Sequence, residues 1–220
     1  MKTIVVAPHP DDEVMGVGGT ILRRKAEGAE VAWLIVTGLT SEAGWNQVAI
    51  KRRSEEIKRV AEIFSFDSIF ELNIPTTQLD RIPMGTLISE ISNVFKIFVP
   101  EEVFVPHPSD IHTDHRMVFN AVASCTKWFR YPSIRRVMAY ETLSETDFNL
   151  GVGQSFKPNV FINIDSYLED KLRALNVYSS EIAEFPFPRS HEAVRALAAV
   201  RGAASGFEAA EAFQLLRERV

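Results

Sequence analysis

Short apolar runs alternate along the chain with longer segments in which apolar residues recur every three or four positions. Runs of the first kind predict β-strands, and segments of the second kind predict amphipathic helices. We expect strands at residues 3–7, 31–36, 69–72, 102–106, 135–141 and 159–164. We expect helices at residues 12–28, 47–64 and 83–98, and another that ends near residue 128. This alternation predicts an α/β fold with a Rossmann-like, mostly parallel sheet flanked by helices.

The last part of the chain has a different pattern. Apolar residues at helical spacing predict three helices, at residues 166–179, 190–204 and 207–219, and therefore a helical C-terminal part. No internal repeat or low-complexity linker interrupts the sequence, so we expect a single domain over residues 1–220.

The first predicted helix contains Gly16-Val17-Gly18-Gly19. This run lacks the G-x-G-x-x-G spacing of a dinucleotide-binding loop, so it favours close packing between helix and sheet.

Two polar clusters follow predicted strands that lie far apart in the sequence. Pro8-His9-Pro10-Asp11-Asp12-Glu13 follows the strand at residues 3–7, and His107-Pro108-Ser109-Asp110-Ile111-His112-Thr113-Asp114-His115 follows the strand at residues 102–106. In open parallel sheets, ligands bind beyond the carboxyl ends of the strands, where the strand order switches. The sequence therefore predicts that both clusters meet at one cleft.

Histidine and carboxylate side chains in these numbers are typical of a mononuclear metal site with its own base. A catalytic zinc usually takes three protein ligands and keeps one open position, and His9, Asp12 and His115 can supply the three. Asp11 can then accept a proton from the water that the metal activates. His112 shares one side of a helical turn with His115, so it can face a reacting carbonyl as an acid or as an oxyanion donor.

Simpler interpretations exist for several of these residues. Asp12 could cap the first helix, and Asp110 or Thr113 could cap the helix after the second cluster. Arg53 could form a surface pair with Glu56, three residues later.

Composition excludes other classes of protein. The 220 residues are 46% hydrophobic and carry a formal net charge of −5, which argues against binding to a nucleic-acid backbone. The single cysteine, Cys125, excludes an internal disulfide or a cysteine-based zinc site. We see neither a signal peptide nor an apolar run long enough for a membrane span, and we expect a cytoplasmic protein.

Together the two clusters resemble the motifs of the LmbE-like, or PIG-L, family of zinc-dependent N-acetylglucosamine deacetylases. The resemblance covers nearly the whole chain and extends to Arg53-Ser54-Glu55-Glu56-Ile57, to Arg201-Gly202 and to Ala210-Glu211-Ala212-Phe213. Where many members have His-x-Ser-Gln after the late helix, this chain has Tyr178-Ser179-Ser180-Glu181.

The resemblance implies an LmbE-like fold and a function for each polar residue of the clusters. His9, Asp12 and His115 would bind zinc, or iron in its place, with Asp11 as the general base. His112 would face the acetyl carbonyl, oriented or tuned by Asp114.

The same resemblance implies a substrate and a way to hold it. Arg53 and Asp80 match positions that hold sugar hydroxyls or a neighbouring group, although Asp80 could be only a turn residue. The substrate would be a small amino sugar or glycoconjugate whose acetyl group is released as acetate. Relatives are often homo-oligomers. We expect Trp45, in the loop at residues 41–46, and the loop around residues 148–156 to line the mouth of the site and to set specificity.

Two other functions fit the clusters. One is metal-dependent hydrolysis of another bond, such as a phosphoester, although sites of that kind often use two metals. The other is a non-catalytic sugar-binding module that keeps the fold, against which the presence of both Asp11 and His112 argues.

Overall fold

The computed structural model describes residues 1–151 and 155–220. Seven strands and six α-helices are assigned in the described residues. The strands are β1 (Lys2–Ala7), β2 (Glu30–Gly38), β3 (Ser68–Pro75), β4 (Glu102–Pro106), β5 (Arg136–Tyr140), β6 (Val160–Asn163) and β7 (Ala210–Glu218). The helices are α1 (Asp12–Ala26), α2 (Gln47–Phe64), α3 (Met84–Phe98), α4 (Thr113–Ser124), α5 (Leu168–Leu175) and α6 (His191–Ala203). Short 3-10 turns, η1 (Leu79–Arg81) and η2 (Asp165–Tyr167), precede α3 and α5.

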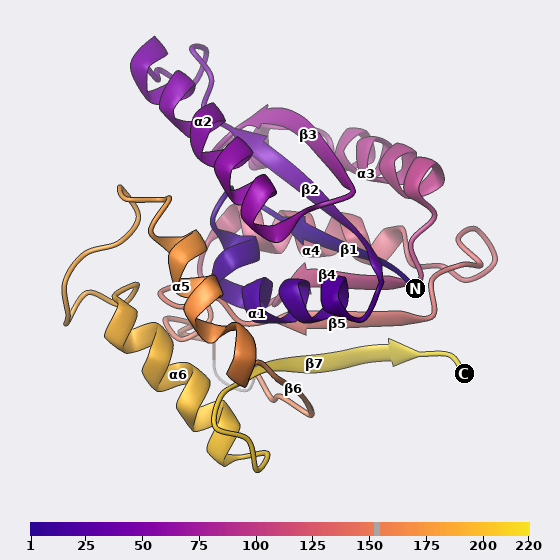
Figure 1. Cartoon of the computed structure of the whole chain (residues 1–220). Coiled ribbons are helices and arrows are strands. Elements are labelled where there is room, and N and C mark those ends of the chain that lie inside the picture. The colour runs from indigo at the N-terminus through magenta and orange to yellow at the C-terminus, as the bar shows by residue number, and fades with distance from the viewer. Residues whose placement is uncertain (152–154) are drawn as a thin grey trace.

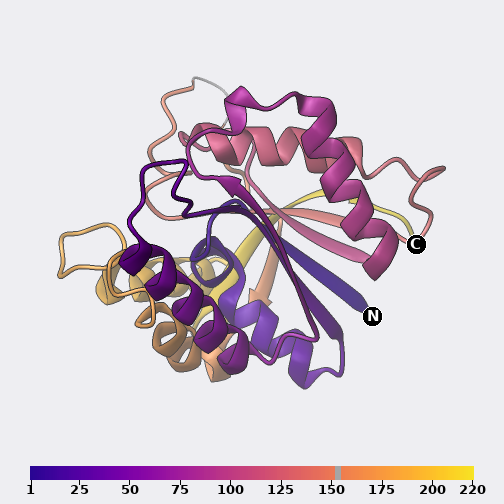
Figure 2. The same cartoon turned by 90° about the horizontal axis from the view of Figure 1, so that it is seen from above.

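The seven strands form one sheet in the order β3-β2-β1-β4-β5-β7-β6. The first five strands are parallel, and β7 runs antiparallel to both of its neighbours, β5 and β6. Helices cover both faces of the sheet (Figures 1 and 2), with α3 and α4 on one face and α1, α2, α5 and α6 on the other. The predicted fold class, a mostly parallel α/β sheet flanked by helices, is therefore confirmed.

Alternation along β1 explains why both faces of the sheet are covered. Val5 and Ala7 are buried in the core under α1 and α2, whereas Ile4 and Val6 are buried in the core under α3 and α4. A strand that is buried on both faces shows a continuous apolar run rather than alternation of apolar and polar residues. That is the pattern from which the strand at residues 3–7 was predicted.

The strand order places the two polar clusters side by side. β1 pairs with β2 on one side and with β4 on the other, with Val5 opposite Phe104. Because β1 and β4 are parallel neighbours, the segments that follow Ala7 and Pro106 leave the same edge of the sheet. This is the switch point at which ligands bind in open α/β sheets.

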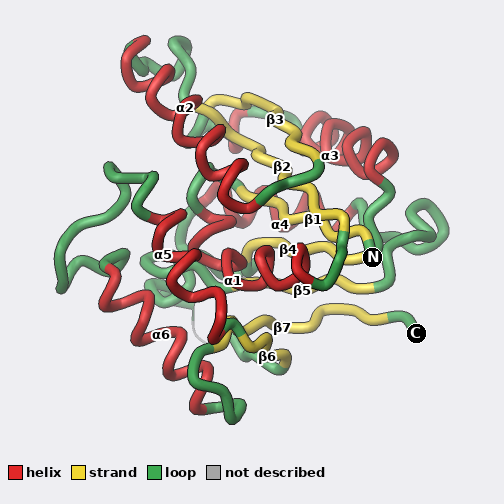
Figure 3. Tube along the Cα trace, in the orientation of Figure 1, coloured by secondary structure: helices red, strands yellow, loops and turns green. Residues whose placement is uncertain are grey.

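One predicted element was wrong: the segment expected as a helix at residues 207–219 contains the strand β7, drawn as a strand in Figure 3. Its alanine, glutamate and leucine residues favour helix in isolation. In the folded chain β7 fills the space between β5 and β6, and ladder hydrogen bonds on both sides override that local preference.

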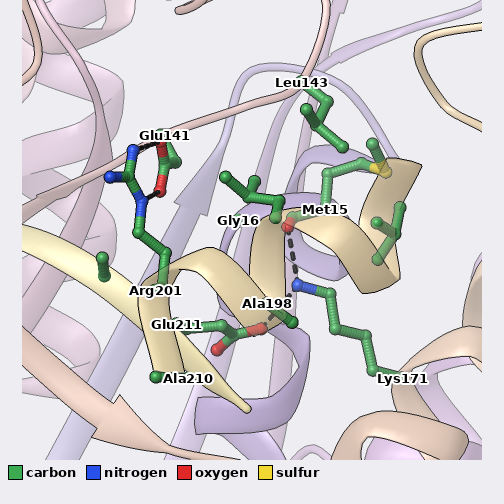
Figure 4. A pocket seen from close by; sticks show the side chains of 12 residues that line it. Met15, Gly16, Glu141, Leu143, Lys171, Ala198, Arg201, Ala210 and Glu211 are labelled. Carbon is green, nitrogen blue, oxygen red and sulfur yellow. Dashed lines mark hydrogen bonds and ion pairs between the residues drawn. The ribbon is translucent and has the colours of Figure 1, made fainter. Parts of the chain in front are cut away.

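A buried ion pair holds β7 against the helices of one face. Lys171 on α5 donates to Glu211 Oε1 at 2.7 Å and to the Met15 carbonyl at 2.8 Å (Figure 4), and both charged side chains are about 95% buried. The Glu211 carboxylate also accepts the N–H groups of Gly19 and Thr20. The Ala210-Glu211-Ala212-Phe213 motif therefore connects β7 to α1 and α5.

The glycines of α1 serve close packing, as predicted. A Cβ atom at Gly16 would lie 2.3 Å from the Tyr140 ring, and one at Gly19 would lie 2.6 Å from the Ile164 side chain. Either contact is too short for any larger residue unless the neighbouring side chain moves.

Some predicted helices are shorter in the structure. α4 ends at Ser124 rather than near residue 128, and α5 covers only Leu168–Leu175 of the expected 166–179. Over the part of the chain that is described, no helix combines the length and the apolar character needed to cross a bilayer.

Candidate active site

The turn between β1 and α1 places two adjacent carboxylates in different directions. Asp11 has φ 140°, a conformation that residues other than glycine rarely adopt, and its N–H donates to the buried Glu13 carboxylate at 3.0 Å. Asp12 begins α1, and its Oδ2 accepts the His9 N–H at 2.9 Å. Unfavourable backbone conformations of this kind persist where the surrounding contacts hold them, often at functional sites.

His9, Asp12 and His115 form a compact group of potential metal ligands. One ligand atom from each lies within 4.8 Å of the others. Asp12 Oδ2 is 3.3 Å from His9 Nδ1 and 3.3 Å from His115 Nε2. Asp12 and His115 are buried, and only 18% of the His9 side chain is exposed. The three residues therefore present two nitrogens and a carboxylate oxygen to one point, a donor set that suits Zn²⁺.

A second carboxylate contacts each of these two imidazoles. Asp110 Oδ2 lies 2.9 Å from His115 Nδ1, and Asp110 Oδ1 accepts the Thr146 hydroxyl at 2.7 Å. Asp114 Oδ2 lies 3.1 Å from His9 Nε2 and accepts the Thr77 N–H at 2.8 Å. Carboxylates in this position fix the orientation of metal-binding imidazoles and raise their basicity.

The carboxylates around His9 and His115 stabilise positive charge on both imidazoles. Burial lowers the pKa of His9, but its hydrogen bonds to Asp114 and Asp12 outweigh this and raise the pKa to about 9. Burial also lowers the pKa of His115, and its carboxylate neighbours Asp12 and Asp110 raise it to about 10. Positive charge on both imidazoles is thus strongly stabilised, and a divalent metal ion can supply that charge in place of the two protons. The residues therefore fit a bound divalent metal.

Asp11, unlike Asp12, does not belong to the group of potential metal ligands. Its Oδ2 accepts a hydrogen bond from Arg189 Nη1 at 2.9 Å. Burial and the nearby Asp12 charge raise the pKa of Asp11 to about 7, although Arg189 opposes them. A metal ion at the neighbouring group would lower this value. A buried carboxylate beside a metal site, held in place but not needed as a ligand, can act as a general base.

His112 lies against both histidines of the metal group, with ring centroids 4.5 Å from His9 and 5.3 Å from His115. Its Nδ1 accepts the Asp114 N–H at 3.1 Å, which caps α4. Burial and the two neighbouring imidazoles lower the pKa of His112 to about 4. A neutral ring that accepts at Nδ1 carries its proton on Nε2, so His112 can donate one hydrogen bond to a substrate.

One alternative from the sequence is wrong, because the residue that caps α4 is His112 rather than Asp110 or Thr113. Asp114 lies against both His9 and His112: its carboxylate contacts His9, its backbone N–H contacts His112, and one ligand atom from each of the three residues lies within 4.8 Å of the others. The ring nitrogens of His107, for which the sequence predicted no role, contact Ser109 and Gln214.

These side chains open into a cavity of about 400 Å³, which is within the range of small-molecule sites. Asp11, His9 and His112 line it, together with Trp45, as predicted, and Arg53. The described residues of the loop at 148–156 are not among the lining residues, and residues 152–154 of that loop lie outside the described part of the chain. The remaining lining residues are Pro10, Thr37, Gly38, Leu39, Arg52, Thr76, Thr77, Glu145, Ser180, Glu181 and Arg189.

The structure brings Arg53 to the site but not Asp80. Arg53 reaches across from α2, and its Nη1 donates to the Pro10 carbonyl at 2.7 Å. It also pairs with Glu56, at 3.0 Å, but both side chains are buried, so this is not the surface pair of the simpler interpretation. Asp80 is exposed on η1 and is not among the described residues that line the cavity.

Sequence reasoning missed Arg189, Glu145 and Glu181 as residues of the site. Glu181 had drawn notice only as a departure from the family pattern, and Glu145 and Arg189 lie in irregular segments without a motif. Only the fold shows that these segments return to the ends of β1 and β4. The orienting contact of Asp110 was also missed, although its position within the second cluster was a usable signal.

Comparison with known proteins agrees with this geometry. A family model described as PIG-L, GlcNAc-PI de-N-acetylase, matches residues 4–126, which is more than half of the chain. That stretch includes both polar clusters.

Individual relatives extend the match toward the C-terminus. A diacetylchitobiose deacetylase of Thermococcus kodakarensis is 29% identical over 98% of this chain and 83% of its own length. A probable N-acetyl-α-D-glucosaminyl L-malate deacetylase of Bacillus cereus is 24% identical over 81% of this chain and 82% of its own. The crystal structure of N,N'-diacetylchitobiose deacetylase from Pyrococcus horikoshii shares the fold, with a TM-score of 0.80 at 23% identity over 98% of this chain and 84% of that one.

Proposed function

Because the chain belongs to the PIG-L family of de-N-acetylases, we propose that it removes the acetyl group from an N-acetylglucosamine-type sugar or glycoconjugate in a metal-dependent reaction. The observation that carries this proposal is the arrangement on the cavity floor. His9 of the metal-binding group, the separate carboxylate of Asp11 and the neutral imidazole of His112 line the same space, and Asp12 and His115 lie buried against His9.

We propose Zn²⁺ as the metal, with Fe²⁺ as the ion that the same nitrogen and oxygen donors also accept. When bound, the divalent ion supplies a Lewis acid that makes water more acidic and the acetyl carbonyl more electrophilic. His9, Asp12 and His115 hold it, and Asp110 and Asp114 orient the two imidazoles.

Asp11 and His112 divide the proton chemistry. Asp11 takes a proton from the attacking water, and His112 Nε2–H donates a hydrogen bond to the carbonyl oxygen as negative charge builds there. Breaking the C–N bond requires a proton on the leaving nitrogen. The pKa of about 4 leaves His112 without a second proton to give at neutral pH, which favours Asp11 as the donor. The products are acetate and a free amine.

The direct test is release of products from a panel of N-acetylated glycosides by the purified, zinc-loaded protein. We expect acetate and free amine in equal amounts, with the glycosidic bond intact. Release of phosphate from phosphoesters, with no amine from any N-acetylated sugar, would instead support a metallohydrolase of another class. Sugar binding without any product would support a non-catalytic module.

Removing the imidazole of His112 should affect turnover more than binding. We expect His112→Ala to retain metal and to lower kcat by roughly 10²-fold or more with a smaller change in KM, because the donor acts mainly in the transition state. His112→Asn is the matched control for the helix, since an asparagine side chain can also cap α4 but does not reach as far as Nε2. If His112→Asn kept near-wild-type kcat, this histidine would be only a helix cap.

A further inference from the structure

Three arginine side chains line the cavity, and none of them is free of a protein carboxylate. Arg52 Nε lies 3.6 Å from Glu56, Arg53 is paired with both Glu56 and Glu181, and Arg189 is paired with Asp11. A guanidinium that is free of such partners binds a carboxylate or phosphate with two parallel hydrogen bonds. In this cavity, carboxylates of the protein itself lie where a carboxylate or phosphate of a ligand would bind the arginines.

Both terminal nitrogens of Arg53 donate hydrogen bonds within the protein, Nη1 to the Pro10 carbonyl and Nη2 to Glu181 Oε1. Nε is buried and lies 3.0 Å from Glu56 Oε2, as an ion pair without a hydrogen bond. Glu181 itself lines the cavity, and 30% of its side chain is exposed. Its negative charge therefore borders the space that a substrate enters and is paired there with Arg53 Nη2.

Arg189 is held in the same way on the opposite side of Glu181. Its Nη1 donates to Asp11 Oδ2 at 2.9 Å, its Nη2 to Glu145 at 3.1 Å, and its Nε to the Ser144 hydroxyl at 2.9 Å. Glu181 Oε2 lies 3.9 Å from Nη1. An anionic substrate group that paired with Arg189 would have to displace either Asp11, the proposed base, or Glu145.

Leaving aside His9 of the metal-binding group, the charged side chains of the described lining balance, with Arg52, Arg53 and Arg189 matched by Asp11, Glu145 and Glu181. An anionic group attached to the sugar would meet Glu145 and Glu181. The one lining guanidinium without a close carboxylate contact is that of Arg52, which is 53% exposed and 3.6 Å from Glu56. Repulsion between these carboxylates and an anionic ligand weakens the binding of that ligand, and it adds little to the affinity for a neutral ligand. Trp45 adds an indole that is 43% exposed in the cavity wall, and an uncharged ring can cover this apolar surface.

We propose that Glu181 makes this site select N-acetylglucosamine linked to an uncharged group, a second neutral sugar, over conjugates that carry a carboxylate or phosphate. This inference rests on the proposed deacetylase function and narrows its substrate class. Glu181 acts by neutralising Arg53 and by repelling anions, so it is a residue of specificity rather than of catalysis.

The test compares one neutral and one anionic conjugate on three proteins. N,N'-Diacetylchitobiose and N-acetylglucosaminyl malate are assayed with the wild type, with Glu181→Gln and with Glu184→Gln. Glu184 is exposed three residues further along the chain and is not among the described lining residues, so its variant makes the same charge change outside the cavity. We expect the wild-type kcat/KM to be about tenfold or more higher for the neutral conjugate.

Glutamine at position 181 keeps the shape of the side chain but frees the charge of Arg53. We therefore expect Glu181→Gln to shift the ratio of the two kcat/KM values toward the malate conjugate by about tenfold, while Glu184→Gln keeps the wild-type ratio. A wild-type preference for the malate conjugate, or an unchanged ratio in Glu181→Gln, would overturn the proposal.

A binding measurement tests the selectivity of Glu181 without depending on turnover. Calorimetric titration of the metal-free wild-type and Glu181→Gln proteins with the same two conjugates should show the same shift in preference. If neither conjugate releases acetate, the deacetylase function fails, and the binding ratio still shows whether Glu181 selects against anions. Equal binding of both conjugates by the wild type would contradict the inference.

Discussion

Replacing His115 with alanine is expected to remove both the bound metal and the activity. Metal content measured after gel filtration should fall from about one ion per chain to a small fraction of that, and turnover should fall below detection even when zinc is added at the concentration that saturates the wild type. The reason is geometric, because His115 Nε2 faces Asp12 from a position that is 99% buried. Water cannot easily replace a ligand at such a position.

Two further variants make this result specific to the site. Asp110→Asn keeps every metal ligand but weakens the contact that orients His115, so we expect metal affinity to fall by about 10–100-fold and excess zinc to restore activity. His191→Ala removes a histidine of α6 whose ring contacts Asn176 outside the site, and should leave metal content unchanged. Full activity in metal-free His115→Ala protein would show that the metal group is wrongly assigned.

The location of the site could be predicted from the sequence because it depends on two simple features. Apolar runs ending at residues 7 and 106 identify parallel strands, and the carboxyl ends of adjacent parallel strands meet at one edge of the sheet. The polar residues directly after those ends are therefore close in space whatever the rest of the chain does. Local motifs are therefore enough to locate a site when they directly follow strands of the central sheet.

The walls of the site could not be predicted in this way. Arg189 reaches Asp11 from a segment 178 positions away, and no periodicity or motif in Phe185-Pro186-Phe187-Pro188 indicates where that segment lies. Glu145 is also on an irregular segment. Side chains on connections between elements are placed by tertiary packing, for which a single sequence carries little signal.

The wrong prediction of a helix in place of β7 has a different cause from the missed wall residues. Here a local signal was present and misleading, since the residues of 207–219 are good helix formers. What makes the segment a strand is the open edge of β5, together with the buried pair between Glu211 and Lys171. Both partners are long-range, so propensity summed along the segment could not reveal them.

The adjacent carboxylates Asp11 and Asp12 should respond differently to the same substitution. Asp11→Asn is expected to retain metal and to lower kcat by on the order of 10²-fold or more, because the amide cannot accept the proton that a general base takes. An asparagine oxygen can still accept the hydrogen bond from Arg189, and the backbone contact with Glu13 is unaffected. A loss of activity in this variant can therefore be attributed to the missing base rather than to a rearranged turn.

Asp12→Asn should instead weaken metal binding, because a neutral amide oxygen is a poorer ligand than the carboxylate that His9 and His115 both face. The comparison is made by metal titration and by kcat at saturating metal, with each variant serving as the control for the other. Both substitutions remove one buried negative charge from the same turn, so a difference between them reflects function rather than charge. If Asp11→Asn lost metal while Asp12→Asn kept it, the two carboxylates would have exchanged roles. The contact between Arg189 and Asp11 would then support a metal ligand instead of a base.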